Sequence, residues 1–300
     1  MRTCALPDGT PVPVLGLGTW RLGESGAQRA REVAALRQAL EMGYRLFDTA
    51  EMYADGGAET VLGTAIGEAL RAGGVRREEL FIVTKVYPHN ASRTGTVAAC
   101  ERSLARLALD HVDLYLLHWH GQHPLADTCA AMRSLVERGM VRYWGVSNFD
   151  VDDMQELDEL QRKLEARAGG AAAFEDAPGL RCAADQVYYS LRARGVEREL
   201  LAWLRRNGMP LMAYSPIDEG QLASDGFLAG LGRRLGASAA QIALAWVLRQ
   251  PGVIAIPKAA REDHLRENLA ALDLALPPEI LAQLDRRFPA PRGKPPLDMR

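Results

Sequence analysis

Four side chains that could jointly reduce a carbonyl group follow three short apolar runs of the chain. Asp48 ends the run RLFD, with Tyr53 five residues later, Lys85 ends LFIVTK, and His118 ends VDLYLLH. A free tyrosine has a pKa near ~10, and a nearby ammonium group should lower that pKa because it stabilises the phenolate. Tyr53 could then protonate a carbonyl oxygen, oriented by His118, while the carbon receives a hydride. Asp48 could hold Lys85 charged and in place. This chemistry is general acid catalysis, and it requires a hydride source.

Each of these residues also has an ordinary structural explanation. A lysine after a strand is usually a solvated surface charge, and an aspartate there commonly belongs to a turn or a helix cap. Tyr53 alone could be an exposed loop aromatic. The coincidence of all four residue types after successive runs favours the chemical interpretation, provided that the runs are strands whose ends converge.

Eight apolar runs supply such strands, and they alternate with segments in which apolar residues recur every three or four positions, as in 27–43, 58–74 and 238–252. This alternation predicts an α/β fold, a (β/α)8 TIM barrel, whose catalytic residues lie at the C-terminal ends of the strands. The runs are VLGLG (14–18), RLFD (45–48), LFIVTK (80–85), VDLYLLH (112–118), VRYWGVS (141–147), CAADQV (182–187), PLMAYS (210–215) and VIAIPK (253–258).

A doubly wound dinucleotide-binding fold is the main alternative, and its glycine motif is not present where it would be expected. The segment GLGTWRLG (16–23) departs from GxGxxG because its sixth position is Arg21 and Gly23 comes two residues late. A dinucleotide would therefore have to bind in a different manner.

We expect residues 1–300 to form a single barrel domain with three additions. TPVPV (10–14), after the Asp-Gly turn at 8–9, predicts a short N-terminal β-hairpin. The low-complexity segment 166–180 is predicted to be a mobile loop insertion on the face away from the active site. The prolines of residues 289–300 predict an irregular C-terminal tail that could fold over a pocket.

Composition excludes several classes of partner. With 48% hydrophobic and 25% charged residues and a net charge of −2, the chain gives no reason to expect binding to nucleic acid or to an anionic membrane. Its start does not resemble a secretory signal, and no segment is long and apolar enough to span a bilayer. Cys4, Cys100, Cys129 and Cys182 form no CxxC pair, which predicts free thiols in a reducing compartment. We therefore expect a cytoplasmic protein, with a monomer as the default.

The stretch DLYLLHWHGQH (113–123) raises a second chemistry, a metal-dependent hydrolase. His118 and His120 form an HxH pair, and such a site needs further ligands from later strands. No histidine lies between His123 and His264. We therefore predict no metal site, with His118 catalytic and His120 and His123 in a loop near the rim of the pocket.

Seven separated motifs resemble the aldo-keto reductase family, from Val14 to about Phe288. They are GYRLFDTAEMY, TK at 84–85, LLHWH, GVSNF, DQV, AYSP and AIPK, in this order. The resemblance implies a (β/α)8 barrel that holds NADPH in an extended pose without a Rossmann fold, and that reduces carbonyl compounds to alcohols. Within this family, the chain resembles bacterial, NADP-dependent aldehyde and ketone reductases.

Residue by residue, the resemblance implies a catalytic and a cofactor-binding set. Asp48, Tyr53, Lys85 and His118 match the catalytic four. The implied cofactor contacts are Thr19, Trp20 and Asp48 near the nicotinamide, Ser147, Asn148 and Gln186 on its carboxamide, Tyr214 stacked on its ring, Ser215, Pro216 and Ile217 along the pyrophosphate, Lys258 and His264 near the 2′-phosphate, and Asn268 on the adenine. Trp20, Met52 and Trp119 are expected to wall an apolar substrate pocket.

Three positions depart from the family pattern. Ala259 stands where strong NADP binders usually have a hydroxyl, and His264 where they have an arginine. Because histidine is mostly neutral at pH 7, the 2′-phosphate would lose charge partners, for which Arg261 or Arg266 could substitute. Asp185 precedes Gln186, where asparagine is common. Lys258 favours NADPH as cofactor, with NADH as the alternative.

Three functions remain to be separated. The first is the reduction of small aldehydes and reactive ketones. The second is a nucleotide-binding regulatory or scaffold barrel without turnover, and the third is the metal-dependent hydrolase. The four catalytic residue types argue against a decayed site.

Overall fold

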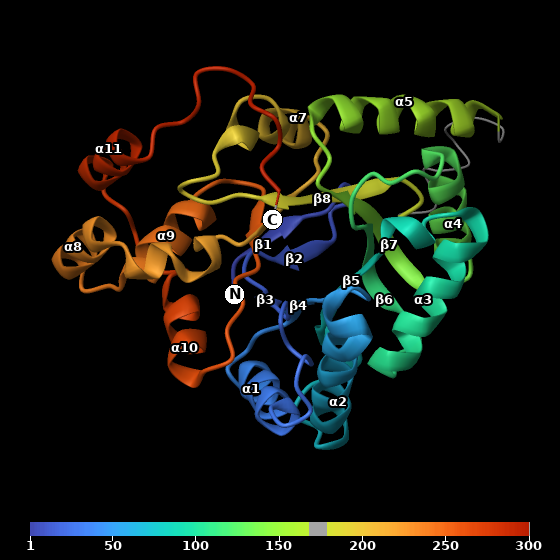
Figure 1. The fold of residues 1–300 in the computed structure, drawn as a ribbon, viewed down its shortest axis with the longest axis horizontal. Coiled ribbons are helices and arrows are strands. Elements are labelled where there is room, and N and C mark those ends of the chain that lie inside the picture. The colour runs from blue at the N-terminus through green and yellow to red at the C-terminus, as the bar shows by residue number, and fades with distance from the viewer. Residues whose placement is uncertain (168–178, 300) are drawn as a thin grey trace. The chain divides into compact units, whose positions relative to one another are not determined.

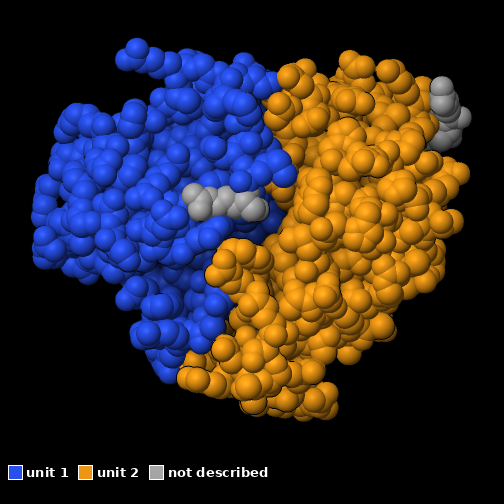
Figure 2. All heavy atoms as spheres, in the orientation of Figure 1, with its two compact units in different colours: residues 1–18, 186–300 blue, residues 19–185 orange. Residues whose placement is uncertain are grey.

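The computed structural model describes residues 1–167 and 179–299, and these form two compact units. Residues 1–18 and 186–300 make up unit 1, and residues 19–185 make up unit 2 (Figure 2). Residues 168–178, most of the predicted insertion at 166–180, lie outside the described residues.

Unit 2 repeats a strand followed by a helix (Figure 1). Neighbouring strands from β4 to β7 pair in parallel and in chain order, and β8 follows β7 in the sheet. β5 and β6 are buried along their whole length, as expected for parallel strands covered on both faces. The elements are α1 Arg29–Glu41, β4 Leu46–Asp48, α2 Gly57–Arg71, β5 Phe81–Val86, α3 Arg93–Leu107, β6 Val112–Leu117, α4 Leu125–Glu137, β7 Val141–Ser147, α5 Val151–Arg167 and β8 Cys182–Tyr188, which continues into unit 1.

Unit 1 continues the same pattern. β9 follows β8 in the sheet and pairs in parallel with β10, and the segment 15–18 bridges to Ala255 and Lys258. β1 and β2 form a separate antiparallel hairpin. The elements are β1 Thr3–Ala5, β2 Pro11–Pro13, β3 Leu17–Gly18, α7 Leu200–Arg206, β9 Leu211–Tyr214, α8 Gly226–Leu235, α9 Ala239–Leu248, β10 Val253–Ala255, α10 Glu262–Ala270 and α11 Pro278–Arg287.

Each unit has its own core of large side chains and its own helix caps. Phe47, Tyr115 and Trp144 are buried in unit 2, and Tyr189 and Trp246 in unit 1. Capping fixes where several helices begin, because a side-chain oxygen accepts from a backbone N–H that would otherwise lack a partner. Ser92 caps α3 in this way, and Ser238 caps α9 in a capping box with Gln241.

The strand order confirms the predicted (β/α)8 class with a short N-terminal hairpin. Each of the eight apolar runs contains a strand, and all of these strands are parallel where their pairing is defined. The tail at 289–299 contains no helix or strand, as its prolines predict. Whether 1–300 acts as one domain stays a prediction.

No helix in the described ranges combines the length and the apolar character that crossing a membrane would require.

The four cysteines are free thiols, as predicted. Burial raises the pKa of Cys4 to about 11 and the pKa values of Cys100 and Cys129 to about 12. Burial also raises the pKa of Cys182, which lies in β8. All four thiols are therefore protonated at neutral pH.

Candidate active site

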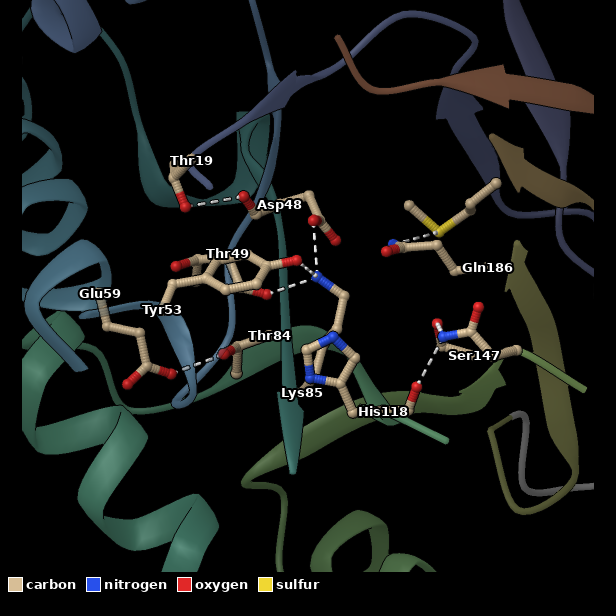
Figure 3. Close-up of polar contacts among 12 residues, drawn as sticks. Thr19, Asp48, Thr49, Tyr53, Glu59, Thr84, Lys85, His118, Ser147 and Gln186 are labelled. Carbon is tan, nitrogen blue, oxygen red and sulfur yellow. Dashed lines mark hydrogen bonds and ion pairs between the residues drawn. The ribbon is translucent and has the colours of Figure 1, made fainter. Parts of the chain in front are cut away.

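Lys85 connects two of the other predicted catalytic residues (Figure 3). Its fully buried side chain extends from β5, and its Nζ donates to Asp48 Oδ1 at 2.6 Å, to the carbonyl oxygen of Thr49 at 2.8 Å, and to Tyr53 Oη at 3.1 Å. Asp48 is the last residue of β4, the strand that pairs with β5. A lysine is almost never fully buried unless it is paired, and here three oxygens satisfy its three donors. The alternative of a solvated surface lysine is therefore wrong for Lys85.

His118 lies beside Tyr53. It follows the last residue of β6, its side chain is buried, and its ring makes an edge contact with the ring of Tyr53 at 5.8 Å between centroids. Burial, and secondarily the charge of Lys85, hold the pKa of His118 well below its usual range. The imidazole is therefore neutral at pH 7 and keeps one N–H donor. Its Nδ1 has no hydrogen-bond partner within the described part of the chain.

The pKa of Tyr53 corrects one expectation from the sequence. Removal of the phenol from water is the largest influence and raises its pKa above the usual value, and the charge of Asp48 adds to this rise. Lys85 does lower the pKa, as predicted, but it offsets burial only in part. Burial lowers the pKa of Lys85 itself, yet Asp48 and Tyr53 outweigh that effect, so the net direction is upward. Lys85 is therefore charged and Tyr53 protonated at neutral pH.

The turn that carries Tyr53 has an unusual backbone. Tyr53–Gly56 forms a tight turn in which Ala54, Asp55 and Gly56 have φ values of +52°, +50° and +84°. Such left-handed residues are costly for side chains other than glycine and persist only where their surroundings hold them. A Cβ atom at Gly56 would lie 2.3 Å from Nε of Arg106, so the guanidinium packs directly against this turn.

Arg106 is part of a buried network that sequence reasoning missed. Glu59, in the first turn of α2, accepts from the Thr84 hydroxyl at 2.6 Å (Figure 3). It also accepts from Arg106 Nε at 2.6 Å. Thr84 immediately precedes Lys85 in β5. The signal was present in the sequence, because Glu59 shares a helical face with the buried residues Leu62 and Gly63. The network connects the turn of Tyr53 to the strand of Lys85.

Three further predicted residues lie next to these four. Thr19 Oγ1 donates to the backbone oxygen of Asp48 at 3.0 Å. Asn148, with φ +59°, donates from Nδ2 to the carbonyl oxygen of His118 at 3.0 Å and to Ser147 Oγ at 3.2 Å. Ser147 is the last residue of β7. The parallel strands of unit 2 therefore place their polar C-terminal residues at one edge of the sheet.

The predicted pocket aromatics differ in their surroundings. Trp119 is half-buried, and its ring lies 5.0 Å from that of His118 and 5.1 Å from that of Tyr87. Trp20 is 37% exposed, and the guanidinium of Arg21 lies 4.3 Å above its ring. Met52 is half-buried beside Tyr53 in the sequence. The contact with His118 places Trp119 beside the predicted catalytic residues.

Unit 1 carries the remaining predicted cofactor residues. Gln186 is buried in β8, with Nε2 at 4.0 Å from Met212 Sδ. Tyr214 ends β9, and its ring stacks on Tyr188 at 5.7 Å with an interplanar angle of 16°. Ser215 has φ +47°, and Pro216 is buried, while Ile217 is half-buried.

The predicted 2′-phosphate and adenine residues lie on the segment 258–268 of unit 1. Lys258 and His264 are exposed, whereas Asn268 is buried in α10. Arg261 and Arg266 are paired with Asp263 and Glu262, respectively. Either arginine would have to share its charge with a carboxylate in order to bind a phosphate.

The other two histidines of the 113–123 stretch lie in the loop between β6 and α4, as predicted. His123 Nε2 is 3.1 Å from the carbonyl oxygen of His89, and His120 Nδ1 is 3.9 Å from a carboxylate oxygen of Asp153. Within residues 1–167 and 179–299, no three His, Cys, Asp or Glu side chains are grouped so that they could hold a metal ion.

Comparisons with known proteins agree with the motifs. A sequence model described as the Aldo/keto reductase family matches residues 14–287. The chain is 46% identical over 293 residues to methylglyoxal reductase YeaE of Escherichia coli, covering 96% of this chain and 95% of that protein. It is 34% identical over 283 residues to glyoxal reductase of Bacillus subtilis, covering 94% and 91%. A crystal structure of an aldo-keto reductase from Klebsiella pneumoniae in complex with NADPH matches with a TM-score of 0.88 at 44% identity, covering 100% of this chain and 99% of that one.

Proposed function

This chain belongs to the aldo/keto reductase family, and from that premise we propose that it reduces aldehydes and reactive ketones to alcohols with NADPH as the hydride donor and Tyr53 as the general acid. Small 1,2-dicarbonyl compounds are the first substrates to consider, because the two similar proteins described above are named for methylglyoxal and glyoxal. The three apolar side chains expected around the pocket, Trp20, Met52 and Trp119, suit small and varied carbonyl compounds.

One observation carries the assignment of the acid. A buried ammonium group, Lys85 Nζ, bonds at once to a carboxylate of Asp48 and to the hydroxyl of Tyr53, with the ring of His118 against that of Tyr53. An ion pair that served stability alone would not need a phenol as its third partner. A phenol in this position can lose its proton only because a fixed positive charge lies next to the oxygen.

The pKa directions suit proton donation. Burial raises the pKa of Tyr53, so the phenol holds its proton at neutral pH until a stronger base, the oxygen of a carbonyl under reduction, is present. Lys85 then stabilises the developing phenolate at 3.1 Å, and Asp48 keeps Lys85 charged. His118 is neutral and can donate its N–H to the same substrate oxygen and orient it. Bound NADPH supplies the hydride that the carbon receives.

Each unit, taken by itself, carries side chains of the kinds that such a cofactor needs. The buried Nδ1 of His118 leaves a polar atom for a ligand. Asn148, whose amide bonds to the backbone oxygen of His118 and to Ser147 Oγ, and Ser147 are assigned to the carboxamide. In unit 1 we assign Gln186 to the carboxamide, Tyr214 to the ring, Ser215, Pro216 and Ile217 to the pyrophosphate, and Asn268 to the adenine. The exposed ammonium of Lys258 suits a 2′-phosphate, which favours NADPH over NADH, while Ala259 offers no hydroxyl to it.

One assay tests the proposal. The loss of reduced-nicotinamide absorbance is followed with methylglyoxal or a simple aldehyde, with NADPH or NADH, and with and without a chelator. We expect turnover with NADPH that the chelator does not change. Tight NADPH binding without turnover of any carbonyl would favour a regulatory or scaffold protein, and ester or amide hydrolysis abolished by the chelator would favour a metal-dependent hydrolase.

A monomeric state and a cytoplasmic location are also part of the proposal. Sedimentation tests the first, and cell fractionation tests the second.

A further inference from the structure

The loop that follows β9 holds its backbone in a strained conformation. Ser215, Asp218 and Glu219 have φ values of +47°, +53° and +53°, and Gly220 follows with +90°. Left-handed residues other than glycine cost free energy, and they persist where surrounding contacts determine them. Backbone hydrogen bonds close the loop locally, from Asp218 N to Ser215 O at 2.9 Å and from Gly220 N to Ile217 O at 3.0 Å. This loop contains the residues proposed to bind the pyrophosphate.

A buried carboxylate anchors this loop from within. Asp218 is fully buried, and its two carboxylate oxygens accept from different residues, one at the end of β8 and one in the segment that follows it. The hydroxyl of Tyr188 donates a very short hydrogen bond to Oδ1, and Arg192 Nη1 donates to Oδ2 at 3.1 Å. Arg192 also donates to Gln221 Oε1 at 2.9 Å, and its Nη2 lies 3.7 Å from Asp225 Oδ2. One arginine therefore contacts the loop at Asp218 and Gln221 and also the N-cap residue of α8, Asp225.

The same cluster connects to the ring proposed to stack on the nicotinamide. The ring of Tyr188 lies flat against that of Tyr214, while its hydroxyl bonds to Asp218. Tyr188 thus has two fixed contacts, one to the last residue of β9 and one to the loop that begins directly after it. Movement of Asp218 would remove one of the contacts that hold Tyr188, whose ring supports that of Tyr214. All of these residues belong to unit 1.

We propose that Tyr188, Asp218 and Arg192 are positioning residues that hold the 215–221 loop and the Tyr214 ring in the conformation that binds the cofactor. The inference rests on the proposed function of this loop and ring. None of the three residues needs to touch the reacting atoms. Their loss should therefore weaken cofactor binding more than it slows the chemical step.

Tyr188→Phe and Asp218→Asn test this, with Tyr189→Phe as the matched control. Tyr189 is the adjacent buried tyrosine, and its hydroxyl donates at 2.6 Å to Glu197, which is not a residue of the 215–221 loop. For both test variants we expect the KM and Kd for NADPH to rise about tenfold, the effect of one lost hydrogen bond to a charged group. We expect kcat at saturating NADPH to fall by less than about threefold, because the proton donor is untouched. Tyr189→Phe should change the melting temperature to a similar extent but leave the Kd for NADPH unchanged.

Arg192→Ala provides a second test, in case the buried variants do not fold. Its partly exposed side chain can be removed without opening the core, and Arg192→Lys should restore part of the lost affinity. If Tyr188→Phe and Arg192→Ala bind NADPH as tightly as the control, the inference is wrong. If wild-type protein binds neither NADPH nor NADH, the proposed function fails instead, and the two failures are thereby distinguished.

Discussion

Lys85 and Lys258 both end a short apolar run, yet the structure places them in opposite environments. Lys85 is buried in unit 2, with three oxygens within 3.1 Å of its Nζ. Lys258, beyond the end of β10 in unit 1, is exposed. We propose that the first stabilises a phenolate and the second binds a phosphate. A proton donor needs a charge at a fixed distance, whereas an anion that arrives from solvent can be met by a mobile ammonium group.

Replacement of the phenol that Lys85 serves should have the largest effect. Tyr53→Phe removes the proposed acid but keeps the ring against His118, so we expect kcat to fall by about 10²- to 10⁴-fold. Cofactor binding should persist, as measured by the quenching of protein fluorescence on addition of NADPH. A near-normal kcat would show that Tyr53 is not the acid. Lys85 would then have no phenolate to stabilise, and its proposed role would be wrong.

Replacement of the exposed lysine should affect binding rather than chemistry. Lys258→Met is expected to raise the KM for NADPH by about 10- to 100-fold, since a charge-assisted hydrogen bond is lost. NADH, which has no 2′-phosphate, serves as the internal control, and its KM should hardly change. Equal effects on both cofactors would contradict the assignment of Lys258.

The network behind the Tyr53 turn should have a smaller effect on kcat. Arg106→Ala removes the guanidinium that packs on Gly56 and bonds to Glu59, so the turn loses a support. We expect kcat to fall about tenfold, because small misplacements of reacting groups are costly. Arg138→Ala is the control, since it breaks an exposed ion pair with Glu101, and such pairs contribute little. If both variants keep full activity, the fixed geometry around Lys85 does not depend on this network.

The smallest expected effect is a loss of stability of the folded chain at mildly acid pH. The pKa of His118 is well below its usual value in the folded chain, so below about pH 6.5 the unfolded chain binds more protons at this residue. Stability should therefore fall as the pH drops from about 6.5, and the part that depends on His118 should be absent in His118→Asn. Melting temperatures measured from neutral to mildly acid pH give the two slopes. Identical slopes would mean that burial does not hold this histidine neutral.

The two lysines also show which features of the structure could be predicted from the sequence. The parallel run of strands, the hairpin and the polar residues at the strand ends were predictable from apolar periodicity and turn residues, and Asp48, Tyr53, Lys85 and His118 come together as predicted. The local motif did not show that Lys85 is buried and Lys258 exposed. That difference depends on which oxygens the fold brings to each lysine.

Other features escaped prediction because they depend on contacts between distant segments. Glu59 and Arg106 are 47 positions apart, and Tyr188 and Asp218 are 30 positions apart. The pKa of Tyr53 was predicted in the wrong direction because the sequence showed a neighbouring cation but not how much water the fold removes from the phenol. Desolvation is a property of the whole environment, and no single motif encodes it.

The four free thiols bear on the proposed substrates. Dicarbonyl compounds and reactive aldehydes are electrophiles, and a cysteine attacks an electrophile as its thiolate. Raised pKa values keep all four sulfurs in the unreactive form, and three of these side chains are also buried away from solutes. A protein that handles such compounds would thus resist alkylation by its own substrates, without any disulfide to protect its sulfur atoms.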